Sequence, residues 1–78
     1  MITGLQTKMA RASLRWTAKD LAEKSGVSWA TVQRMERVDG VPSAAAPNLE
    51  AVQRALEAGG VEFTNGDAPG VRLGRDKG

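Results

Sequence analysis

Two signals for the start of a helix stand close together in the chain, at Thr17 and Ser28, with a glycine between them. Thr17 is followed three residues later by Asp20, a spacing typical of a capping box. Gly26 can adopt the left-handed conformation that ends a helix at small steric cost. We therefore expect two short helices joined by a tight turn. Helices joined so closely must cross at a steep angle, so the second one can face outward.

These signals place the two helices at about 18–25 and 29–37, and apolar periodicity predicts one further helix on each side of them. The first covers 4–14 and has an apolar face formed by Leu5, Met9 and Ala12. The last begins near Pro47-Asn48, stops at Gly59-Gly60 and has an apolar stripe formed by Leu49, Val52 and Leu56.

Beyond the last helix, residues 61–63 and 71–73 alternate apolar and polar side chains in the manner of short strands. Asn65-Gly66 between them is a turn signal. The sequence thus predicts a mainly α fold with four helices over 1–60, followed by a short C-terminal β-hairpin and tail over 61–78.

The composition excludes several classes of function. Seventy-eight residues suffice for one domain with a small core. The chain contains no cysteine and no histidine, which excludes disulfides, a thiolate nucleophile, zinc held by these residues and an imidazole base. The carboxylates follow no catalytic pattern, so we expect no enzyme, no metal and no cofactor. Without a leader or an apolar run of roughly 18 residues, we expect a cytoplasmic protein that does not contact membranes.

The charge is distributed unevenly. Residues 1–37 carry seven basic and three acidic side chains, whereas the remainder carries four basic and six acidic ones. A basic N-terminal half of this kind would turn toward a polyanion such as nucleic acid, although scattered solvated charges are the simpler alternative.

The segment 17–36 reads TAKDLAEKSGVSWATVQRME and contains the pattern L-A-x-x-x-G-V-S-x-x-T-V-x-x-x-E. It resembles the helix-turn-helix of the Cro and lambda-repressor-like family, the XRE class, and the resemblance extends over about 4–63. The resemblance implies a lambda-repressor-like domain whose second helix of the pair lies in the major groove of double-stranded DNA. It also implies a homodimer on two half-sites about one helical turn apart. The expected function is a transcriptional regulator, most simply a repressor of a palindromic operator.

Carried over by position, the resemblance implies two sets of contacts. The residues expected to contact base edges are Trp29, Ala30, Thr31, Gln33 and Arg34. The residues expected to contact the phosphate backbone are Arg15, Thr17, Lys19, Ser28 and Arg37. Many relatives have glutamine where this chain has Ala18, so the contact made by that glutamine must be absent or replaced here.

Three further interpretations concern single positions. Trp29 is unusual near the start of such a helix, and contact with DNA, packing within the domain and a protein interface all remain open. The positions of Arg11 and Glu36 resemble those that pair the first helix with the third in the family, so we expect a structural ion pair. Trp16, Met9 and Leu56 are expected in the core.

The hairpin has two credible uses, because such short strands are marginal on their own. They either pack on their own helices or join those of a second copy. We expect the latter, with dimerisation through Val61, Phe63, Val71 and Leu73. The alternative function is an antitoxin or antiactivator-type module on the same fold, which would bind a protein partner through Trp29.

Overall fold

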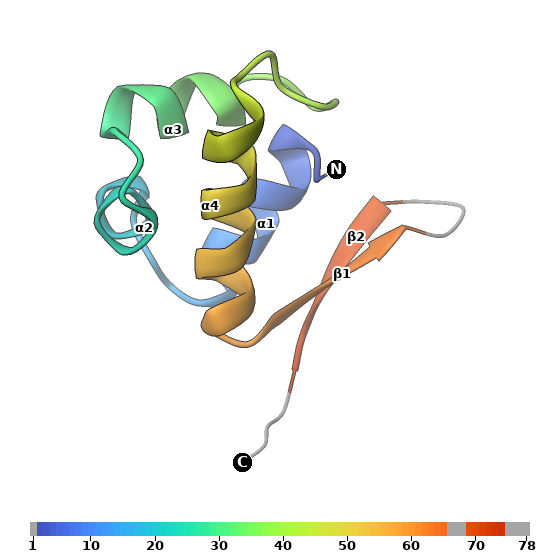
Figure 1. Cartoon of the computed structure of the whole chain (residues 1–78). Helices are drawn as coiled ribbons and strands as arrows, with labels where there is room; N and C mark the ends of the chain where they lie inside the picture. Colours follow the sequence, from blue (N-terminus) through green and yellow to red (C-terminus); the bar gives the residue numbers. More distant parts are fainter. Residues whose placement is uncertain (1, 66–68, 75–78) are drawn as a thin grey trace.

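A computed structural model describes residues 2–65 and 69–74 of the chain. These residues form four helices followed by a two-stranded antiparallel hairpin (Figure 1). The helices are α1 (Gly4–Ser13), α2 (Ala18–Ser25), α3 (Trp29–Glu36) and α4 (Ala46–Ala58). The strands are β1 (Val61–Asn65) and β2 (Pro69–Leu73). The predicted order of elements is confirmed.

The helix ends follow from local chemistry. Thr17 caps α2 by accepting the N–H of Asp20, and the Asp20 carboxylate accepts the N–H of Thr17 in return. A second reciprocal box opens α1, where Thr3 and Gln6 exchange the same pair of hydrogen bonds. Each box satisfies amide groups that the first turn of a helix leaves without partners.

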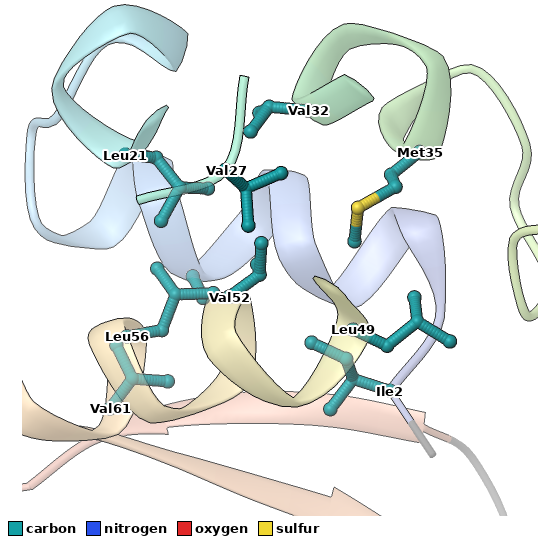
Figure 2. Packing of buried hydrophobic residues seen from close by; sticks show 10 residues of the cluster. Ile2, Leu21, Val27, Val32, Met35, Leu49, Val52, Leu56 and Val61 are labelled. Atoms are coloured by element: carbon teal, nitrogen blue, oxygen red, sulfur yellow. The ribbon is translucent and has the colours of Figure 1, made fainter. Parts of the chain in front are cut away.

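The core lies where the helices meet (Figure 2). Leu21 of α2, Val32 of α3 and Val52 of α4 are fully buried there. Val27 enters from the turn between α2 and α3, and Val61 enters from the first residue of the hairpin. The hairpin therefore shares the core of the helical part.

The apolar face predicted for α1 is not the face that the structure buries. Leu5 and Ala12 are exposed, whereas Gly4, Thr7 and Ala10 are buried. The reason is close backbone approach: a Cβ added to Gly4 would stand 2.1 Å from the carbonyl oxygen of Val38. Small side chains on that face allow contact with the end of α3, and apolar periodicity does not detect this kind of packing.

Among the other residues expected in the core, Leu56 is fully buried, while Trp16 packs against the core and remains half-buried. Met9 is also only half-buried. The predicted turn at Asn65-Gly66 reaches beyond the described residues, because residues 66–68 are not among them, and the tail after Gly74 also lies outside them.

The hairpin packs on α1 and α4 of its own chain. Its register pairs Val61 with Leu73 and Phe63 with Val71, so all four predicted dimerisation residues share one face. Val61 belongs to the core, and Phe63 and Val71 pack against it, whereas Leu73 is half exposed. Most of this apolar face therefore packs within the monomer, and dimerisation through these residues stays a prediction.

Candidate nucleic-acid interface

Gly26 sets the direction of α3. Its φ of 75° places it in the left-handed region, and its N–H donates to the carbonyl of Ala22 at 2.9 Å. Val27 then turns inward and is 7% exposed, while Ser28 caps α3 by accepting the N–H of Thr31. Figure 1 shows α2 nearly end-on while α3 lies across the view, so the two helices cross steeply as predicted.

One side of α3 is anchored and the other faces solvent. Val32, Met35 and Glu36 are buried. The exposed residues are Trp29, Ala30, Gln33 and Arg34. Four of the five residues predicted to contact bases therefore lie on the outward side. The fifth, Thr31, is half-buried, and its Oγ1 accepts the hydroxyl of Ser28 at 2.9 Å, which ties it to the cap.

All five residues predicted for the phosphate backbone are exposed: Arg15, Thr17, Lys19, Ser28 and Arg37. They come from the turn before α2, from the first turn of α2 and from both ends of α3. Arg15 has a φ of 59°, which is unusual for a residue with a side chain. The tight turn between α1 and α2 thus holds a basic side chain at the surface.

Asp20 is the acidic residue next to Lys19 on α2, and its carboxylate already accepts a hydrogen bond within the capping box. The backbone N–H of Thr17 donates to it at 2.9 Å. This hydrogen bond, followed by that of the Thr17 hydroxyl, lowers the pKa of Asp20 below its ordinary value. The carboxylate therefore stays ionised at the N-terminus of α2, where negative charge is favoured.

Arg11 and Glu36 form the expected ion pair. Arg11 Nε and Nη2 donate to the two carboxylate oxygens of Glu36 at 2.8 and 2.9 Å. Arg11 Nη1 also donates to the carbonyl of Trp16 at 3.0 Å. The hydrogen bond with Glu36 raises the pKa of Arg11, although burial acts in the opposite direction. The pair connects α1 to the end of α3 and has a structural role.

An open groove of about 520 Å³ runs between α2 and the start of α3. Its lining includes Lys19, Glu23, Ser28 and Trp29, and half of the surface of Trp29 is exposed. Sequence reasoning identified Trp29 but not the groove, because Glu23 gave no signal beyond an ordinary helical charge.

Two further residues were not anticipated. Gln6 is fully buried, and its Nε2 donates to the carbonyls of Thr64 and Gly70, one on each strand of the hairpin. The Thr3–Gln6 spacing could have predicted a capping box, but not the contact with the hairpin. Lys24, which resembles a solvated charge in the sequence, places its Nζ 5.0 Å from the centre of the Trp16 ring.

No protein-family model matches the sequence, and a comparison with curated proteins finds no significant relative.

The described ranges, 2–65 and 69–74, hold no group of three acidic side chains placed to bind a metal ion. Within the same ranges, no helix has both the length and the apolar character needed to cross a membrane.

Proposed function

We propose that this chain is a sequence-specific DNA-binding transcriptional regulator of the Cro and lambda-repressor-like type, and that it represses a palindromic operator as a homodimer. The observation that supports this most is the orientation of α3. Its buried side is anchored by Val32, Met35 and Glu36, and its opposite side presents polar and basic groups to solvent. A helix of about 10 Å diameter presented in this way fits the major groove.

The exposed side chains of α3 supply the chemistry needed to read bases. Gln33 can form two hydrogen bonds with adenine, and Arg34 can form two with guanine. Ala30 offers a methyl group to thymine, and the methyl of Thr31 can do the same from its half-buried position. Trp29 offers an aromatic face to a sugar or base at the edge of the major groove of DNA.

The surrounding cations supply affinity that is independent of sequence. Arg15, Lys19 and Arg37 are placed to contact phosphates, while the Thr17 hydroxyl and the first amides of α3 after Ser28 add neutral donors. Phosphate contacts release counterions, so the affinity for any duplex falls as salt rises. Sequence preference, by contrast, depends on Gln33 and Arg34.

A selection of bound duplexes from a random pool tests this proposal. We expect an enriched palindrome with half-sites about one helical turn apart. Anisotropy titrations then compare the selected duplex with a scrambled one at several salt concentrations. A pool without any enriched sequence would contradict the proposal, and a single enriched half-site would contradict the homodimer.

One observation favours a second candidate function. The groove between α2 and α3 is lined by an acidic side chain, Glu23, and by the half-exposed ring of Trp29. Exposed aromatic side chains are the main anchors of many protein interfaces. Such a protein-binding module would capture its partner through Trp29 with little dependence on salt. Trp29→Ala would then abolish the capture, whereas Gln33→Ala on the same helix would leave it unchanged.

A further inference from the structure

The exposed side of α3 divides into an apolar part and a polar part. Trp29 and Ala30, in the first turn, are exposed, and Trp29 presents half of its surface to solvent. Gln33 and Arg34, one turn further along, are also exposed and carry an amide and a guanidinium group. Ala30 contributes only a methyl group, and Trp29 contributes an aromatic ring with a single N–H donor. We refer to Trp29 and Ala30 together as the first-turn surface of α3.

The hydroxyl groups next to this surface are already engaged. The Ser28 hydroxyl donates to Thr31 Oγ1 at 2.9 Å, and Ser28 Oγ accepts the N–H of Thr31 at 3.2 Å. The two oxygen atoms therefore serve the cap of α3. The chemical character of the first-turn surface is set by a ring and a methyl group.

An apolar surface in the major groove matches one chemical group. The base edges there carry hydrogen-bond donors and acceptors, and the C5-methyl group of thymine is the apolar exception. A polar base edge covered by Ala30 would lose hydrogen bonds to water without replacement, which is unfavourable. A methyl group covered by Ala30 and Trp29 instead gains by leaving water. Methylation of cytosine at C5 places the same methyl group at the same ring position, whereas uracil and unmethylated cytosine carry a hydrogen there.

The spacing along α3 places this methyl group beside the bases proposed for Gln33 and Arg34. Ala30 precedes them by three and four residues, so the three side chains share one side of the helix. Neighbours of this kind have Cβ atoms about 5–6 Å apart, and consecutive base pairs are stacked about 3.4 Å apart. The base that faces Ala30 therefore lies about one or two base pairs from a base that faces Gln33 or Arg34.

We propose that the first-turn surface of α3 is a receptor for the C5-methyl group of a pyrimidine in the operator, supplied either by thymine or by C5-methylated cytosine. This inference rests on the proposed function, because it requires α3 to lie in the major groove. Cytosine methylation within a half-site therefore strengthens binding. The regulator then responds to the methylation state of its operator as well as to the sequence.

Uracil substitution in the duplex selected from the random pool tests this proposal without changing the protein. Replacing thymine by uracil removes the methyl group and keeps the hydrogen-bonding groups of the base. We expect one thymine in each half-site at which this replacement raises the dissociation constant about fourfold, and about fifteenfold when both half-sites are changed. Uracil at thymines outside the half-sites is the control and leaves the affinity unchanged. A selected half-site without thymine, or a complete set of uracil replacements without effect, overturns the proposal.

Cytosine methylation supplies the complementary measurement. The sensitive thymine is replaced by cytosine, and its paired adenine by guanine, in two duplexes that differ only in the C5-methyl group. We expect the methylated duplex to bind about fourfold more tightly for each half-site. Equal affinities of the two duplexes overturn the proposal.

Two variants of α3 separate the first-turn surface from the rest of the helix. In Trp29→Ala, the ratio of the dissociation constants of the uracil and thymine duplexes is expected to fall toward one. In Gln33→Ala, both duplexes bind more weakly but the ratio is retained, because Gln33 faces a different base. The full ratio in Trp29→Ala, or the same loss in Gln33→Ala, overturns the assignment to this surface.

Failure of this inference is distinguishable from failure of the proposed function. A pool without any enriched sequence contradicts the proposed function and the methyl receptor together. An enriched palindrome whose affinity is indifferent to uracil and to cytosine methylation leaves the proposed function standing and overturns the methyl receptor alone.

Discussion

Arg11 of α1 holds Glu36, the last residue of α3, through two hydrogen bonds between the guanidinium and the carboxylate. The same guanidinium donates to the carbonyl of Trp16, in the turn before α2. One side chain therefore joins α1, the α1–α2 turn and the end of the helix proposed to read DNA. The exposed fractions of the Arg11 and Glu36 side chains are only 21% and 10%, so water solvates neither charge fully and each depends on the other.

Removing one partner of this pair is expected to destabilise the fold. Glu36→Gln leaves the largely buried Arg11 without a counter-charge, and we expect a loss of about 2 kcal/mol in the free energy of unfolding. Glu62→Gln is the matched control, because Glu62 pairs with Arg72 on the exposed side of the hairpin. That change is expected to cost less than about 1 kcal/mol by urea denaturation. Equal losses in the two variants would contradict the structural role of Arg11 and Glu36.

Gln6 is expected to hold the hairpin on the helices. Gln6→Leu removes the donor shared by the carbonyls of Thr64 and Gly70, and we expect a loss of about 2 kcal/mol in the free energy of unfolding. The amides of β1 and β2 should also exchange faster with solvent. Gln53→Leu, on the surface of α4, is expected to change the stability by less than about 0.5 kcal/mol. Unchanged exchange in the hairpin of Gln6→Leu would rule out this role.

The left-handed backbone at Arg15 predicts an unusual gain in stability. Arg15→Gly removes the side chain that makes a φ of 59° unfavourable, and we expect the free energy of unfolding to rise by about 0.5 to 1 kcal/mol. Arg15→Ala keeps the Cβ and should show no gain. Both variants remove the guanidinium, so both should weaken DNA binding to a similar degree. A stabilised Arg15→Ala would exclude backbone conformation as the cause.

Asp20 predicts a dependence of stability on acid. Its folded pKa lies below the ordinary value of 3.8, so the carboxylate favours the folded state when it is ionised. This contribution is complete above the ordinary pKa and is lost as the pH falls through the lower folded value. Denaturation curves measured at pH values around and below 3.8 should show this loss in the free energy of unfolding. Asp20→Asn should make the free energy of unfolding less dependent on pH in that range. An NMR titration that gave Asp20 an unshifted pKa would contradict the prediction that the capping box lowers it.

The elements set by local signals were predictable from the sequence. Thr17 determines where α2 begins, Gly26 where it ends, and Ser28 where α3 begins, because capping and left-handed geometry depend on neighbouring residues. The buried side of α1 was not predictable in this way. It depends on the approach of Gly4 to the backbone near Val38, far along the chain, and on two hydrogen bonds from Gln6 to the hairpin.

The candidate site shows the same division. The exposure of Gln33 and Arg34 follows from the spacing of Val32 and Met35 on α3, which the sequence displays. The groove beside Trp29 requires α2 and α3 to be placed in space, so no spacing within either helix indicates it. The packing of Val61 and Phe63 on the helices of their own chain is a tertiary contact, which the alternation within the strands does not indicate.

The claim that the outward face of α3 reads sequence is tested most directly by a ratio of affinities. The ratio compares the duplex selected from the random pool with a scrambled duplex at one salt concentration. In the double variant Gln33→Ala/Arg34→Ala we expect this ratio to fall close to one while weak binding to both duplexes persists through the remaining cations. Arg54→Ala, an exposed cation on α4, should keep the full ratio. A double variant that retained the preference of the unmodified chain would contradict the proposal that this face of α3 reads sequence.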